Sequence, residues 1–377
     1  MNPKIVKILK KVPIARAAYR LARRLFLDTW HSRRVFGYDR SRFLKFSCRK
    51  RDSREAELAG IIMLYHVIEK GLTMPDFACG HARERVISLA GKLNEFADKF
   101  GTEEPQFRAA VAVLAEFKKI HDDAHFVLDE ECSRALEGIL TRVPVGPSHQ
   151  TEMTRERYWS QLDSPFEQFA ASRHSVRNFA GTVSVEQIRA AVALANNAPS
   201  SCNRQFVRVH CVADRELVQK CLALQNGNRG FGHLADKVLV VTADLRAVSL
   251  LERNDLFVNG GIYLMNLCYA LHKNRVAHCL LNWSVKPETD LKLRKLLSLP
   301  DAETVITLLA CGDVPAEFKL AGSPRKCVTE TLILHGVSEK KTGGGKPLIC
   351  AFNQNSLAFP QWRSRGAVGS VCSRRAA

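Results

Sequence analysis

Segments with helical and strand-like hydrophobic patterns alternate between residues 155 and 335, and this alternation limits the fold more than any other feature. Val238–Thr242 is a short, uninterrupted apolar run, as expected of a strand that is covered on both faces. Asp255–His272 is long and largely apolar, which predicts a central helix. We therefore expect a mixed α+β domain. Its other predicted helices span 165–172, 184–197, 215–224 and 287–297, and its other predicted strands span 207–212, 276–281 and 304–310.

Residues 51–150 show only helical periodicity. Apolar side chains recur there at three- and four-residue spacing, which is typical of amphipathic helices. A Pro- and Gly-rich stretch, Pro144–Ser148, then predicts a linker. We expect an all-helical N-terminal region made of Arg54–Lys70, Ala82–Phe100, Pro105–His125 and Asp129–Leu140.

Two pairs of side chains in this helical region have the spacing of metal ligands. His66 with Glu69, and His121 with His125, lie three or four residues apart and so share a helix face. Neither pair comes with a reliable third ligand, which a stable site needs. We therefore predict no metal site.

The positive charge of the chain is concentrated at its N-terminus. The formal net charge is +18, and residues 1–50 hold 15 Lys and Arg against Asp28 and Asp39, a local net charge of +13. Apolar residues from Ile5 to Val12 recur at helical spacing between lysines, so this basic amphipathic segment fits an anionic membrane surface. The alternative is a helix packed on its own domain with a solvated basic face. Nucleic acid is a poorer partner, because no binding motif is present and aromatic residues do not interleave with the basic run.

The remaining features indicate a reduced, cytoplasmic protein that contacts a membrane at most peripherally through residues 1–50. The 12 cysteines include no Cys-x-x-Cys pair, which fits free, buried thiols. No run of about 18 apolar residues is present, and lysines and arginines interrupt any secretory h-region. Residues 336–377 are rich in Gly and Ser and predict a flexible tail.

Four loops carry the residue types expected at a cofactor site. Ser172–Phe179 offers two arginines and a serine to a phosphate, and Asn196–Gln205 is a run of small and polar residues between a helix and a strand. Gln225–Gly232 is glycine-rich but lacks the G-x-G-x-x-G pattern of a dinucleotide fold. Ala321–Lys326 is a basic turn after the last predicted strand. Each loop taken alone also fits an ordinary solvated connection.

Taken in this order, the loops resemble the nitroreductase family of FMN-dependent oxidoreductases over residues 163–335. The resemblance is carried by Ser172–Phe179, Ala198–Gln205, Asn259-Gly260-Gly261 and Ser323-Pro324-Arg325. It implies a nitroreductase-like α/β sandwich at 155–335 that binds FMN between the subunits of a homodimer. This chain differs from the family pattern in having Phe206 after Gln205, Gly322 before the Ser-Pro-Arg turn, and Leu281-Asn282-Trp283 after a strand.

The resemblance also implies roles for individual residues. Arg173, Ser175 and Arg325 would hold the FMN phosphate, His174 would lie beside the flavin, and Arg177 would face its N1/O2 edge. The segment with Pro199, Ser200, Ser201, Asn203 and Gln205 would approach the ring, in many family members from the partner subunit. Asn228 and Ser323 complete the expected cofactor-binding set.

The function implied is that of a flavoprotein which transfers hydride from NAD(P)H through FMN to a small electron-accepting molecule. A nitro compound, a quinone and a biosynthetic intermediate all fit this description. Such an enzyme needs no catalytic protein nucleophile, because the flavin carries the chemistry. The alternative is a basic, membrane-associated adaptor whose reductase domain has no redox activity.

Overall fold

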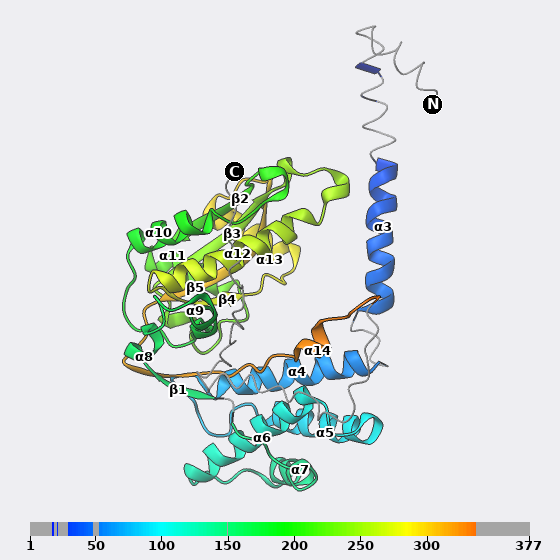
Figure 1. Ribbon diagram of the computed structural model, residues 1–377, viewed down its shortest axis with the longest axis vertical. Coiled ribbons are helices and arrows are strands. Elements are labelled where there is room, and N and C mark those ends of the chain that lie inside the picture. The colour runs from blue at the N-terminus through cyan, green and yellow to red at the C-terminus, as the bar shows by residue number, and fades with distance from the viewer. Residues whose placement is uncertain (1–16, 19–20, 22–28, 48–52, 149, 337–377) are drawn as a thin grey trace, which may run out of the picture. The chain divides into compact units, whose positions relative to one another are not determined.

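The computed structural model describes residues 17, 18, 21, 29–47, 53–148 and 150–336 (Figure 1). The chain divides into two compact units, residues 1–326 and 327–377. Within the described residues, the second unit contains the short helix α14 (Val328–Thr331). The tail predicted at 336–377 lies outside the described residues from residue 337 onward.

Residues 54–140 form four helices around one hydrophobic core, as predicted. Each begins close to the residue expected from the sequence. Ser53 caps the first by accepting a hydrogen bond from the Ala56 N–H, and Asp129 caps the last by accepting from the Cys132 N–H. Buried Leu, Ile, Phe and Val side chains from all four fill the core. The helices are α4 (Arg54–Gly71), α5 (Arg83–Phe100), α6 (Pro105–Asp123) and α7 (Glu130–Leu140).

A four-stranded sheet with entirely antiparallel pairing forms the centre of the α+β domain. Its strands are β2 (Val207–Val212), β3 (Lys237–Asp244), β4 (Ala277–Leu281) and β5 (Glu303–Gly312), in the order β2-β3-β5-β4. All four were expected from the sequence, but their order was not. The sheet has a helical layer on each face (Figure 1).

The two faces of β3 explain its uninterrupted apolar sequence. Val238 and Val240 join one core with helices α11 (Arg215–Ala223) and α13 (Pro287–Leu297). Leu239 and Val241 join a second core with α10 (Val185–Ala195) and α12 (Asp255–Lys273). Because successive side chains of a strand point to opposite faces, both sets of positions must be apolar.

The structure corrects the expectation that the 255–272 helix is central. One side of α12 is buried in the second core, through residues such as Leu267 and Leu271. Four large apolar residues on its other side are between 40% and 56% exposed: Phe257, Val258, Ile262 and Met265. Helix α12 therefore covers the sheet and presents an unpartnered apolar stripe.

Several short elements were not predicted. Strands β1 (Thr151–Thr154) and β6 (Glu317–Leu320) form a separate antiparallel ribbon, with Thr151 opposite Leu320. With four residues each and charged side chains, they give little periodicity to detect. The domain also contains α8 (Arg155–Trp159), the expected helix α9 (Phe166–Ser172), and four 3₁₀ turns at Ser201–Asn203, Gly232–Leu234, Leu245–Ala247 and Leu250–Glu252.

Helix α3 (Thr29–Phe46) is the longest described part of the basic N-terminal segment. It buries none of its residues, and Arg253 forms a two-pronged ion pair with its Asp39, with nitrogen–oxygen distances of 2.6 and 2.8 Å. The apolar residues Ile5–Val12 lie outside the described residues. None of the helices in the described ranges is both long and apolar enough to cross a membrane.

Eight of the described cysteines are free, among them the buried Cys268, Cys279 and Cys311. Cys327, in the second unit, is disulfide-bonded. The expectation that the cysteines are free thiols is therefore wrong for Cys327.

Candidate functional site

The Ser172–Phe179 loop runs in extended form beside strand β4. The Val176 N–H donates to the His278 carbonyl at 3.0 Å, and Val176 and Phe179 are buried. The Tyr158 hydroxyl donates to the His174 carbonyl at 3.4 Å. These contacts fix the backbone of the loop while the side chains of Arg173, Ser175 and Arg177 stay partly exposed.

Two buried histidines, His272 and His278, lie beneath this loop. Nε2 of His272 donates to the Ser172 hydroxyl at 2.9 Å, and that hydroxyl donates in turn to the Phe169 carbonyl. Burial is the main cause that lowers the pKa of His272 to about 3 and that of His278 to about 4, and the Arg173 guanidinium lowers both further. Among the buried side-chain atoms of the described residues, Nδ1 of His272 and Nε2 of His278 lack a hydrogen-bond partner. The loop therefore rests on two uncharged imidazoles.

These histidines predict that acid destabilises the fold. An unfolded histidine titrates near pH 6.5, whereas the folded pKa values are about 3 and 4. Between these limits the unfolded chain binds more protons, so the free energy of unfolding should fall by about 1.4 kcal/mol per pH unit for each histidine as the pH drops below 6.5. Denaturant titrations at several pH values measure this slope. His272→Gln should reduce it, whereas a change at the exposed His81 should not; an equal slope in both variants would contradict the prediction.

Three predicted phosphate- and flavin-binding arginines converge near His174 and β4. The pKa of His174 is lowered, first by burial and then by the charges of Arg173 and Arg325. On β4, burial raises the pKa of the Cys279 thiol, and Arg177 and Arg173 partly offset that rise. Arg173 and Arg325 are 152 positions apart in the sequence, yet both lower the pKa of the same imidazole, that of His174.

Helix α4 adds a fourth cation that was not predicted. Burial lowers the pKa of Lys70, and the next cause is the charge of Arg177. Lys70 also acts on the Cys279 thiol. Nothing in its sequence context distinguishes Lys70 from a solvated lysine at the end of a helix, so only the tertiary structure reveals its location.

The four cations have no acidic partners among the described residues. Throughout the part of the chain that the structure describes, no carboxylate lies within 4.0 Å of a charged nitrogen of Arg173, Arg177, Arg325 or Lys70. Lys70, Arg173 and Arg177 are partly buried and Arg325 is exposed, and gathering like charges where they are partly buried is unfavourable unless a counter-charge is bound. The cluster therefore has the chemistry of an anion-binding site.

The predicted Ser323–Arg325 turn is held by the helical region. Glu69 of α4 accepts a hydrogen bond from the Ser323 N–H at 2.8 Å, and Gln106 of α6 donates to the Pro324 carbonyl at 3.3 Å. Glu69 also accepts from Nδ1 of His66 at 3.1 Å. The three-residue spacing of His66 and Glu69 on α4 therefore lets His66 hold one carboxylate oxygen while the other accepts from the Ser323 N–H. In the described residues, no group of three or more side chains suited to a metal ion is present.

The Ala198–Gln205 loop is organised by the N-terminal part of α12. Asn259 accepts from the Ser201 N–H at 2.7 Å and donates to the Ser201 hydroxyl at 3.1 Å, and that hydroxyl donates to Asp255. Cys202, Asn203 and Gln205 have left-handed φ values of 52°, 54° and 48°. Two motifs that resemble the family, Ala198–Gln205 and Asn259-Gly260-Gly261, are thus brought into direct contact.

Asn228 has a local role in the structure. Its side-chain amide donates to the carbonyls of Leu222 and Gln225, each at 2.8 Å. Gln225 in turn donates to the Asn282 carbonyl at 2.7 Å, and the Trp283 ring nitrogen donates to Asp290 at 2.8 Å. The unusual Leu281-Asn282-Trp283 segment is therefore anchored to the Gln225–Asn228 turn and to α13.

Apart from Asn228, the predicted residues form two groups within one chain. In the first group, Arg173 and Arg325 act on His174, and Arg177 acts on Lys70 of α4. The second group, Ser200, Ser201, Asn203 and Gln205, lies by α12. Within the described residues, no hydrogen bond or ion pair links the two groups. Each group therefore supplies only one part of the expected cofactor site.

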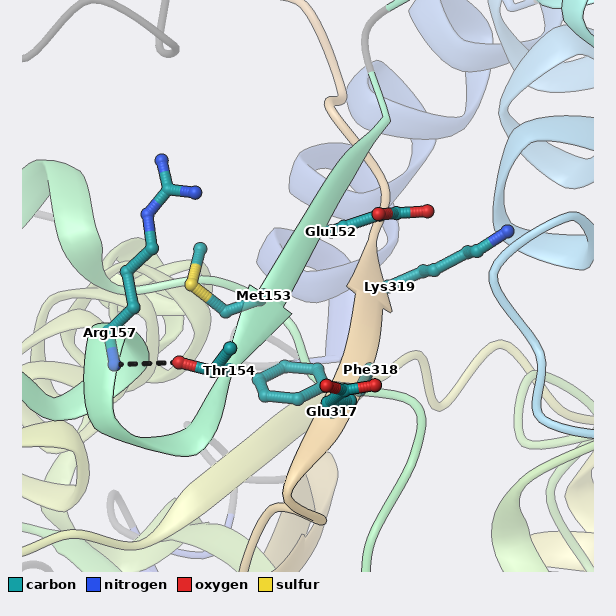
Figure 2. Close-up of a pocket in the computed structure, with 7 residues that line it drawn as sticks. All are labelled: Glu152, Met153, Thr154, Arg157, Glu317, Phe318 and Lys319. Atoms are coloured by element: carbon teal, nitrogen blue, oxygen red, sulfur yellow. Dashed lines mark hydrogen bonds between the residues drawn. The ribbon is translucent and has the colours of Figure 1, made fainter.

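A separate surface pocket lies on the β1–β6 ribbon (Figure 2). Thr154 at its edge caps α8 by accepting a hydrogen bond from the Arg157 N–H at 3.3 Å. None of the predicted cofactor-binding residues lines it. The lining residues are Glu152, Met153, Thr154, Arg157, Glu317, Phe318 and Lys319.

Comparison with known proteins supports the expected family. Residues 170–228 match the model of the nitroreductase family. The matched segment contains the first two predicted loops and the first half of the third, and it supports a flavin-type oxidoreductase. No curated protein matches the chain.

Several solved structures are similar to the domain. A nitroreductase family protein from Streptococcus pneumoniae is 20% identical, with a TM-score of 0.40, and the match covers 45% of this chain and 100% of that one. An FMN-dependent nitroreductase from Clostridium difficile is 19% identical, with a TM-score of 0.35, over 39% of this chain and 86% of that one.

Proposed function

We propose that this chain is an FMN-dependent NAD(P)H oxidoreductase of the nitroreductase type. The observation that carries the proposal is the cluster of Arg173, Arg177 and Arg325: the first two are partly buried, the third is exposed beside the His174 imidazole, and none has an acidic partner among the described residues. The Ser172–Phe179 loop, which carries Arg173 and Arg177, lies inside the segment that matches the nitroreductase family. The match favours a reductase over the alternative of an inactive adaptor.

The residues present fit a flavin mononucleotide. Arg173, Ser175 and Arg325 supply two guanidinium groups and a hydroxyl, which suit a phosphate dianion. Arg177, with Lys70 nearby, supplies positive charge for the N1/O2 edge of the ring, where a cation stabilises developing negative charge. Bound FMN would supply the electron transfer between a reduced nicotinamide and a small electron-accepting substrate, namely a nitro compound, a quinone or a biosynthetic intermediate.

A homodimer is part of the proposal. The exposed stripe of Phe257, Val258, Ile262 and Met265 on α12 is apolar enough to need a partner surface. A second copy related by twofold symmetry can cover it with the same stripe. Since the Ser201 loop is bonded to α12, such an assembly offers that loop as the other part of the site.

A visible absorption spectrum of the purified protein tests the proposed function. We expect bound flavin, or flavin taken up from added FMN, whose absorbance is bleached by NADH or NADPH under anaerobic conditions. Reoxidation by nitroaromatics or quinones then indicates a broad acceptor range, and its absence indicates a specialised substrate. A colourless protein that does not bind excess FMN would contradict the proposal.

A further inference from the structure

The turn that carries Arg325 is fixed by side chains from the helical region. The Ser323 N–H donates to Glu69 at 2.8 Å, and the Pro324 carbonyl accepts from Gln106 at 3.3 Å. The remaining contact is local, since Arg325 donates to the Ser323 carbonyl at 2.6 Å. The Tyr65 hydroxyl donates to Gln106 at 2.6 Å and so orients its amide. Helices α4 and α6 therefore hold the backbone of this turn.

Ser323 needs this support because its φ is 45°. That value lies in the left-handed region, which is unfavourable for residues with a Cβ atom unless surrounding contacts hold them there. The hydrogen bond from the Ser323 N–H to a carboxylate is charge-assisted and so stronger than one between neutral groups. Glu69 is thus well suited to stabilise the unusual backbone.

Glu69 achieves this without neutralising the neighbouring arginine. Its side chain is 0% exposed, and one carboxylate oxygen faces Ser323 while the other faces His66. Among the described residues, no Lys or Arg nitrogen lies within 4.0 Å of its carboxylate, and His66 is its only basic neighbour at that distance. A buried carboxylate is costly unless donors surround it; here His66 of α4 holds one oxygen, and the Ser323 N–H of the turn holds the other. Arg325 keeps its charge available for an anion.

We propose that Glu69 is a positioning residue for the flavin phosphate, which holds the Ser323–Arg325 turn in the conformation that presents Arg325 to that phosphate. The inference rests on the proposed function, because it takes FMN as the ligand. It assigns to the helical region a direct part in building the cofactor site. Glu69 itself does not touch the phosphate.

The test compares FMN with riboflavin, which has the same ring system but no phosphate. In Glu69→Gln, a neutral amide replaces the carboxylate and cannot accept both hydrogen bonds. We expect the dissociation constant for FMN to rise about tenfold, as for loss of a charge-assisted hydrogen bond, and that for riboflavin to change less than about twofold. Quenching of flavin fluorescence measures both constants, and thermal unfolding verifies that the variant folds.

Two further variants make the test specific. Glu95→Gln, an exposed carboxylate on α5, is the matched control and should leave both constants unchanged. Ser323→Gly places a residue at position 323 that accepts the left-handed conformation at little cost. In that background Glu69→Gln should weaken FMN binding less than about threefold, because the two positions are coupled. If Glu69→Gln fails to fold, Tyr65→Phe replaces it, with an expected rise of about threefold for FMN alone.

The remaining outcomes overturn the inference in distinguishable ways. If Glu69 only repelled the phosphate through its negative charge, Glu69→Gln would bind FMN more tightly, which is the opposite of the expected weakening. Equal weakening of FMN and riboflavin indicates a general structural role. Either result, or unchanged FMN affinity, overturns the role of Glu69 and leaves the proposed function standing. Wild-type protein that binds neither flavin overturns both.

Discussion

Arg173→Gln is expected to weaken FMN binding about a hundredfold, because the variant loses charge-assisted hydrogen bonds to the phosphate. Riboflavin binding should change only slightly, since it lacks the group that Arg173 is proposed to hold. The Arg173 charge also lowers the pKa of His278 and that of His272. The variant should therefore raise the pKa of both histidines in flavin-free protein, which NMR titration measures without any cofactor.

Arg189→Gln provides the control for this prediction. Arg189 lies on the exposed side of α10, so its removal lowers the net charge equally while leaving the loop intact. FMN affinity in Arg173→Gln within about threefold of the wild-type value would contradict the assignment of the phosphate site. A higher histidine pKa in that case would still verify where the Arg173 charge lies.

Ile262→Glu is expected to convert the proposed dimer into a monomer. Ile262 lies within the exposed stripe of α12 and is 43% exposed in one chain. A twofold interface contains each substitution twice, and burying two unpaired carboxylates should raise the dimer dissociation constant at least about a hundredfold. Light scattering combined with size-exclusion chromatography measures the mass, and FMN affinity should fall together with dimerisation.

Leu291→Glu is the matched control for the dimer interface. Leu291 is 63% exposed on α13, which packs on the opposite face of the sheet, so this variant should remain dimeric. Wild-type protein that is monomeric at high concentration would contradict the proposed dimer. FMN binding that persists in monomeric Ile262→Glu would show that the site needs only one chain.

Most helices and strands were predictable because their hydrophobic periods are long and regular. The capping box of Ser184 and Gln187 marks the start of α10 as expected, and β2 spans the predicted 207–212. The β1–β6 ribbon was missed because four-residue strands with charged side chains carry almost no periodic signal. The strand order was also missed, since pairing depends on contacts between distant segments.

The candidate site was predictable only in part. The Ser172–Phe179 and Ser323–Arg325 motifs could be found because arginine and serine in short loops are typical of phosphate sites. Glu69 and Gln106 could not, because each contacts the Ser323–Arg325 turn across more than 200 residues of sequence. The shared helix face of His66 and Glu69 was visible, but it raised only a metal interpretation, which the lack of a third ligand ruled against, and it gave no sign of the turn that Glu69 holds.

The sequence by itself determined the longer helices and strands of the α+β domain, the helical nature of residues 54–140 and the resemblance of residues 170–228 to the nitroreductase family. These properties depend on local periodicity and on short motifs, both of which are written along the chain. Only the tertiary structure decided that Arg173, Arg177, Arg325 and Lys70 gather without acidic partners among the described residues, and that α12 exposes an apolar stripe. Charge compensation and burial depend on which distant residues meet, and that is a property of the folded chain.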